Sequence, residues 1–208
     1  MEWKSATDRF TFSDSSIKLC ADPDELKKGI SAESSENSLT HLFSISDPDF
    51  VEQSALTFHR GNDLFTVFQK ANHTAECYWR LDKVEGRSLS LESIVSLRSS
   101  HLETETCQFE LHSQLDENGS LELINQWTAI YRSSSLPLLF LIHPDDANEV
   151  RFSVDTSTLV THLSVPLLER GVIRRTRTRA YFCEHFPTEE EVETVRNQFA
   201  SSEIPLTT

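Results

Sequence analysis

Apolar and polar residues alternate with a period of two through most of the chain from residue 55 onward. The clearest run is 107–112, where Cys107, Phe109 and Leu111 alternate with polar residues. Successive side chains of a β-strand point to opposite faces, so this pattern predicts strands with one buried and one solvated face. Such half-buried strands are typical of antiparallel sheets. The alternation recurs in four further segments: 76–82, 121–127, 150–154 and 159–165.

Short clusters of turn-forming residues separate these runs. They are rich in Gly, Asn, Asp and Pro, which adopt turn conformations readily, and they lie at 60–63, 85–86, 116–119, 143–146 and 169–171. The spacing predicts a mainly β fold: an antiparallel sandwich or barrel of about eight to nine strands.

A short helix is expected near the N-terminus. Asp22 is a cap residue, Pro23 suits the first helical turn, and Gly29 is a stop signal. Together they predict a helix over 22–29.

The length of 208 residues fits a single domain with a substantial core. Residues 1–54 are rich in Ser, Asp and Glu and are expected to form a loosely ordered polar layer. Residues 55–186 form the predicted antiparallel β core. Thr188 and Glu191 make a capping box, and apolar residues follow at helical spacing, so a C-terminal helix is expected over 187–202.

The chain has 33 acidic and 19 basic residues and a net charge of -14. This balance argues against binding to nucleic acid, whose affinity depends on Lys and Arg, and against anionic membrane surfaces. The first residues contain no apolar stretch of signal-peptide length, and the longest apolar run, 136–142, is interrupted by Pro137 and too short to span a bilayer. We therefore expect a cytoplasmic protein with reduced thiols and no membrane partner.

Local catalytic and cofactor motifs are missing. The glycines stand alone, so there is no phosphate-binding loop, and there is no G-x-S-x-G elbow, HExxH pair or CxxC pair. We therefore expect no cofactor, no metal and no enzymatic activity. His143, Asp145 and Asp146 are the nearest approach to a reaction centre, but we interpret them as a turn. Cys183 and His185 lie about 6 to 7 Å apart on a strand, too far for activation of the thiol.

A basic segment over 172–182 stands out in this acidic chain. In extended geometry Arg175, Arg177, Arg179 and Tyr181 share one face. The opposite face is expected to pack on the core and carries Val172, Arg174, Thr176, Thr178, Ala180 and Phe182.

Two interpretations of the arginine face remain open. The arginines can pair internally with carboxylates, and Glu103, Glu105 and 189–191 are the available candidates. Alternatively they bind a carboxylate, a phosphate or an acidic partner, because guanidinium recognises such groups bidentately. The sequence favours a non-enzymatic intracellular β-rich binding or interaction module, with an acidic protein or a small anionic ligand on this face.

The spacing Arg179-x-Tyr181 on a late strand is similar to the carboxylate-holding Arg-x-Tyr of intracellular lipid-binding barrels. The resemblance covers three residues. It implies an alternative function, a lipocalin-like barrel that carries a small amphipathic carboxylic acid, with Arg179 and Tyr181 on the head group.

Overall fold

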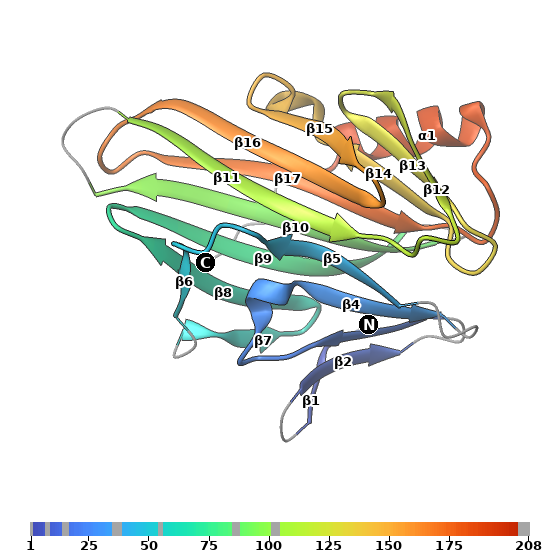
Figure 1. Ribbon diagram of the computed structural model, residues 1–208, viewed down its shortest axis with the longest axis horizontal. Helices are drawn as coiled ribbons and strands as arrows, with labels where there is room; N and C mark the ends of the chain where they lie inside the picture. The colour runs from blue at the N-terminus through green and yellow to red at the C-terminus, as the bar shows by residue number, and fades with distance from the viewer. Residues whose placement is uncertain are drawn as a thin grey trace.

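The computed structural model describes residues 2–6, 9–13, 17–34, 39–53, 56–84, 88–100 and 105–203. In this part the chain forms two antiparallel β-sheets and one α-helix (Figure 1). The predicted mainly β, antiparallel architecture is therefore confirmed. Each sheet keeps two edge strands within the described residues, so the fold is a sandwich and not a closed barrel.

Sheet 1 contains eight strands, and sheet 2 contains nine. In spatial order sheet 1 holds β1 (Lys4–Ala6), β2 (Arg9–Ser13), β3 (Ile17–Ala21), β4 (Ile30–Ser34), β5 (Leu39–Ile45), β11 (Glu105–Gln114), β16 (Thr158–Leu168) and β15 (Val150–Asp155). Sheet 2 holds β12 (Ser120–Asn125), β13 (Thr128–Arg132), β14 (Leu138–Ile142), β17 (Ile173–Phe182), β10 (Ser88–Ser99), β9 (His73–Val84), β8 (Asp63–Lys70) and β6 (Val51–Glu52), with β7 (Phe58–Arg60) paired to β8.

One apolar core is shared by the two sheets. It contains Leu42 and Phe109 from sheet 1 and Trp79 and Phe140 from sheet 2. Phe43 of β5 meets Phe140 of β14 edge to face, with ring centroids 6.5 Å apart. Burial of these large side chains supplies the main driving force for packing the two sheets together.

The segment 1–54 differs from the expected loose polar layer. Its described part forms β1 to β6, and β4 alternates between buried and half-buried residues. The buried positions of β4 carry Ile30, Ala32 and Ser34, so small and polar side chains fill the core side of this strand. Small residues give a weak hydrophobic signal, so the sequence does not predict these strands. The structure therefore has more strands than the eight or nine expected.

The predicted helix over 22–29 is wrong. The structure has only a 3₁₀ turn, η1 (Leu26–Lys28), in the connection between β3 and β4. Asp22 accepts a hydrogen bond from the N–H of Asp24 at 2.9 Å, which closes a local turn instead of a helix N-terminus. A segment this short cannot offset the cost of helix nucleation, and the neighbouring strands set its path.

The predicted C-terminal helix is confirmed as α1 (Glu189–Ala200). Thr188 and Glu191 form the capping box, and α1 packs on the outer face of sheet 2 (Figure 1). Its contact is small, because Phe199 is the one residue of the helix that is fully buried. No helix in the described part of the chain is long and apolar enough to cross a membrane.

Candidate functional site

The basic segment forms β17, which lies between β14 and β10 in sheet 2. In the second half of β17 the alternation is as the sequence indicates: Ala180 and Phe182 enter the shared core, while Tyr181 packs towards α1. Val172 and Arg174, which the sequence predicts on the core side, are exposed instead, and Arg174 pairs with Glu149 at 2.6 Å. The register with β10 places Glu92 directly opposite Arg179. The face that carries the arginines is therefore the outer face of sheet 2, and α1 covers it.

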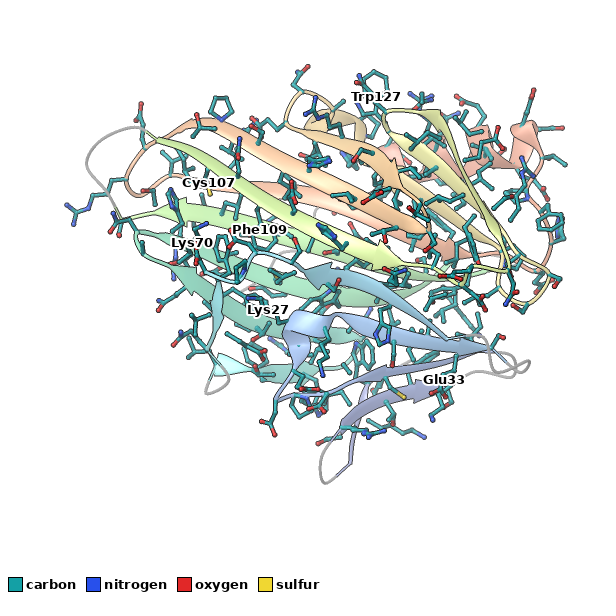
Figure 2. All side chains as sticks on the ribbon, in the orientation of Figure 1. Lys27, Glu33, Lys70, Cys107, Phe109 and Trp127 are labelled. Carbon is teal, nitrogen blue, oxygen red and sulfur yellow. The ribbon has the colours of Figure 1, made fainter. Side chains whose placement is uncertain are left out.

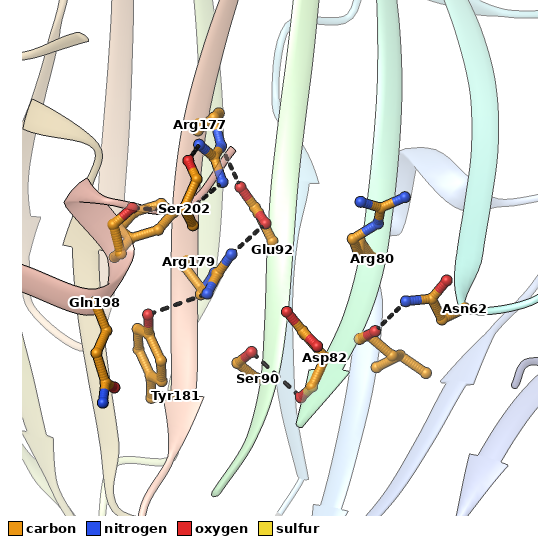
Figure 3. A network of polar contacts seen from close by, with 12 residues as sticks. Asn62, Arg80, Asp82, Ser90, Glu92, Arg177, Arg179, Tyr181, Gln198 and Ser202 are labelled. Carbon is orange, nitrogen blue, oxygen red and sulfur yellow. Dashed lines mark hydrogen bonds and ion pairs between the residues drawn. The ribbon is translucent and has the colours of Figure 1, made fainter. Parts of the chain in front are cut away.

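Glu92 is held by two arginines. Arg177 Nε donates to Glu92 Oε1 at 2.6 Å, and Arg179 Nη2 donates to Glu92 Oε2 at 2.6 Å (Figure 3). Glu92 is 0% exposed, Arg177 2% and Arg179 6%. Buried ions need such close, hydrogen-bonded partners, because leaving one alone in the interior is costly. The geometry thus matches internal pairing with a carboxylate.

Among the carboxylates proposed from the sequence, those of 189–191 are not the partners. Glu103 and the side chain of Glu105 lie outside the described residues. Glu191 caps its own helix and pairs with His185 at 3.2 Å, and the two preceding helical glutamates are exposed. Glu92, on the neighbouring strand, is the partner that sequence reasoning missed.

The C-terminal helix closes over the arginine pair. The Phe199 ring centroid lies 5.1 Å from the guanidinium carbon of Arg177 and 4.4 Å from that of Arg179, which is cation–π geometry. Arg177 also donates to the carbonyl and hydroxyl of Ser202 at 3.0 and 2.8 Å. The pair therefore anchors α1 to sheet 2.

The other two residues of the predicted site are less central. Arg179 Nη1 donates to the Tyr181 hydroxyl at 3.3 Å. Burial raises the pKa of Tyr181, with the positive charge of Arg179 opposing the shift. Arg175 is half-buried and donates to Ser96 at 3.1 Å. Thus Arg177, Arg179 and Tyr181 form one cluster, and Arg175 lies at its edge.

The His143 segment forms a 3₁₀ turn over Pro144–Asp146, as interpreted from the sequence. His143 Nδ1 accepts the N–H of Asp145 at 3.3 Å, and Asp146 Oδ2 accepts the N–H of Arg177 at 2.7 Å. Burial raises the pKa of Asp146 to about 6 and lowers that of His143, which the positive charge of Arg177 lowers further. These side chains are engaged in holding the backbone.

Cys183 and His185 do not form a nucleophile and base pair. Burial raises the pKa of Cys183 to about 11, so its sulfur stays a thiol at neutral pH. His185 pairs with Glu191 at 3.2 Å. The structure brings no base to this thiol within the described residues.

A different place has the features of a binding site. A groove of about 810 Å³ lies between η1, β5 and the segment that leads into β6. Lys27 of η1, labelled in Figure 2, lines one wall, and Ile45 and Gln114 line another. The rim carries Pro48 and Val51, both exposed, and Val51 keeps 60% of its surface in solvent. The groove therefore offers apolar surface beside polar groups.

Glu52 gives this groove its most unusual group. Its Oε2 accepts the backbone N–H of Lys27 at 3.3 Å. Its Oε1 is buried and finds no hydrogen-bond partner in the described part of the chain. Burial raises the pKa of Glu52 to about 7, against the opposing effect of the N–H groups of Lys27 and Leu26. A perturbed carboxyl in a groove is a marker of functional sites.

The cations near the groove are already engaged. Lys27 Nζ donates to the carbonyl of Phe50 at 2.9 Å, and Lys28 pairs with Glu25 at 2.5 Å. Asp24, which also lines the groove, is exposed. The groups left for a ligand are therefore mainly carboxylates, in a chain of net charge -14.

The backbone beside the groove is strained. Phe43 has φ 58°, at a register shift between β5 and β11, and its N–H donates to Ser113 at 3.2 Å. A left-handed conformation costs a bulky residue on the order of 1–3 kcal/mol and is concentrated at functional sites. Gly29 packs against the same bend: a Cβ there would lie 2.3 Å from the Leu42 carbonyl oxygen.

No known family model matches the chain, and no curated protein matches it in sequence.

Proposed function

We propose that the protein is a binding module that holds a small organic amine in the groove beside Glu52. The observation that carries the proposal is the buried Oε1 of Glu52, which lacks a hydrogen-bond partner among the described residues. An unpaired buried carboxyl raises the free energy of the folded protein, so a ligand that supplies its partner binds favourably.

An ammonium group suits this position better than an anion. At about 4 Å and an effective dielectric of 20, opposite charges attract by roughly 4 kcal/mol. The negative charge of the chain also attracts cations from solution. An apolar body on the amine would pack on Pro48 and Val51 at the rim.

The arginine face is the weaker binding site. Arg177 and Arg179 already hold Glu92 beneath α1, so an acidic partner or small anion would have to displace both the carboxylate and the helix. A fatty-acid carrier would need Arg179 and Tyr181 to face the interior. They face α1 instead, opposite to the shared core.

A cytoplasmic location is part of the proposal. All four cysteines are free, and Cys20, Cys77 and Cys107 are buried. Unpaired thiols are typical of proteins in a reducing compartment.

The test compares two ligands with the same apolar body, 4-phenylbutylamine and 4-phenylbutyric acid. We expect the amine to shift the amide NMR signals of Lys27, Ser44 and Val51, and the acid to leave them unchanged. Glu52→Gln keeps the shape and removes the charge, so it should abolish binding of the amine. Equal binding of the acid, or shifts that map to β17 and α1, would contradict the proposal.

A further inference from the structure

A second cluster lies at the other end of sheet 1, where β11, β16 and β15 are neighbours. Ser153 Oγ lies 2.6 Å from His162 Nε2, and His162 Nδ1 lies 2.8 Å from Glu110 Oε1. A hydroxyl on one imidazole nitrogen and a carboxylate on the other is the arrangement of a serine-hydrolase triad. The triad is recognised by geometry, whatever the fold or the order in the chain.

The strand register builds this cluster. Glu110 of β11 is opposite His162 of β16, and His162 is opposite Arg151 of β15. Ser153 follows Arg151 by two residues and so shares its face. Adjacent residues such as Phe109 and Phe152 point into the core. The cluster therefore lies on the outer face of sheet 1, with all three triad side chains partly exposed.

Glu110 is suited to orient the imidazole. Its Oε2 lies 3.3 Å from His112 Nε2, so histidines engage both of its oxygens. Burial acts to raise the pKa of Glu110, but the hydrogen bonds to His112 and His162 outweigh it and lower the pKa. A carboxylate at Nδ1 selects the tautomer with the proton on that nitrogen. His162 Nε2 is then free to accept the proton of Ser153.

A cavity of about 650 Å³ lies against the cluster. Glu110, His162 and Arg151 line it, together with the polar side chains of Gln126 and Asn148. Arg151 is exposed and projects from the same strand face as Ser153. Its guanidinium is a positive charge two residues from Ser153 along β15, on the side where a negative charge would develop beside the serine. Ser153 is not among the lining residues, so the cavity would hold the polar part of a substrate beside the serine.

We propose that Ser153, His162 and Glu110 form a catalytic triad that hydrolyses a small polar carboxylic ester, with Arg151 stabilising the oxyanion. This activity goes beyond ligand binding in the Glu52 groove and is independent of it. The sequence shows no local catalytic motif because three separate strands contribute the three residues.

The proposed reaction balances with water alone. Ser153 Oγ attacks the ester carbonyl carbon as its proton moves to His162 Nε2, and Arg151 faces the resulting oxyanion. The C–O bond to the alcohol then breaks, and the imidazolium returns the proton to the departing oxygen. Water attacks the acyl-serine while His162 accepts its proton. The acid is released, and the proton returns to Ser153.

The test uses a fluorophosphonate probe and p-nitrophenyl acetate on the whole chain. We expect intact-mass analysis to show one probe adduct, which peptide mapping places on Ser153, with loss of fluoride. Ser153→Ala should remove the adduct. His162→Gln should lower kcat for the acetate by about a hundredfold or more, because general base catalysis is lost.

The sheet itself supplies a matched control. Ser46 Oγ lies 2.9 Å from His112 Nε2 on the same face, but the carboxylate contact of His112 uses that same nitrogen. Ser46 therefore lacks the triad arrangement, and Ser46→Ala should keep both labelling and turnover. Circular dichroism and the melting temperature check that each variant is folded.

Glu110 is a positioning residue in this proposal, so Glu110→Gln should lower kcat and leave KM unchanged. Arg151→Lys should retain more activity than Arg151→Gln, since it keeps a positive charge near the oxyanion. A wild-type chain without an adduct at millimolar probe would overturn the proposal. So would equal labelling of the wild type and Ser153→Ala, which would make the cluster a structural network only.

Discussion

Glu92 Oε2 lies 2.6 Å from Nη2 of Arg179, its direct cross-strand neighbour, and Glu92 Oε1 lies equally close to Nε of Arg177. One fully buried carboxylate thus binds two nearly buried guanidiniums beneath α1. This arrangement turns a basic segment on an acidic protein into an internal anchor for the helix.

Removing the carboxylate should be strongly destabilising. Glu92→Gln leaves two buried guanidiniums without a counter-charge, so we expect a loss of about 3–5 kcal/mol in the free energy of unfolding. Urea denaturation of the wild type and of Glu92→Gln measures this loss. The matched control is Glu76→Gln, which removes a 3.2 Å pair between a half-buried Glu76 and an exposed Arg98 and should cost about 1 kcal/mol or less. Equal losses for both variants would show that the buried pair has no special role.

The Phe199 ring should be the main attachment of α1 to sheet 2. Phe199→Ala removes a buried ring that contacts both guanidiniums, so a loss of about 3–5 kcal/mol is expected. Faster amide hydrogen exchange should be confined to α1. Phe186 is 48% exposed, and Phe186→Ala should leave both measurements nearly unchanged. Protection of α1 that survives in Phe199→Ala would contradict this assignment.

Glu52 should make stability fall as pH rises. Its pKa is about 7 in the folded protein, whereas an ordinary Glu has a pKa of about 4.3. The folded state therefore binds more protons between these values, and the free energy of unfolding decreases as pH rises from about 4.5 to 7. The decrease is at most ~4 kcal/mol. The stabilisation that comes from protonated Glu52 is fully present below pH 4.5 and is lost above pH 7.

Denaturation at pH 5 and pH 8 checks this dependence in the wild type and in Glu52→Gln. Asp146, with a pKa of about 6, contributes in the same direction in both proteins. The difference between the two proteins therefore isolates Glu52. An identical pH response in both would mean that Glu52 titrates normally.

Gly29 should be less replaceable than Gly171. Both have positive φ, 76° and 82°, but a Cβ on Gly171 meets nothing within 4 Å. Gly171→Ala should therefore lower stability by about 1–2 kcal/mol from backbone strain alone. Gly29→Ala adds a clash with the Leu42 carbonyl and should lower the melting temperature clearly further. Similar melting temperatures would mean that η1 can move away from β5.

The alternation of residues predicts the sheets and their faces well, because a period of two is a local property of the chain. The side-chain directions along β17 and the capped helix after Thr188 follow from it directly. Strand register is not local. Glu92 is the one acid of β10, among serines and apolar residues, and only the pairing with β17 shows that it meets Arg177 and Arg179.

The same limit applies to both candidate sites. Glu110, His162 and Ser153 occupy polar positions on three strands, and nothing in their spacing reveals that they touch. Glu52 lies on a two-residue strand, where its burial depends on η1, which the sequence misrepresents as a helix. Local patterns therefore predict the fold class, and tertiary pairing decides the chemistry.

The most direct test of the binding proposal is the pKa of the Glu52 carboxyl group, measured with and without 4-phenylbutylamine. The ¹³C chemical shift of the carboxyl carbon follows its titration. The predicted value is about 7 in the free protein, and saturating amine should lower it by favouring the ionised form. A free pKa near 4.5, or a raised value that the amine does not change, would contradict the account.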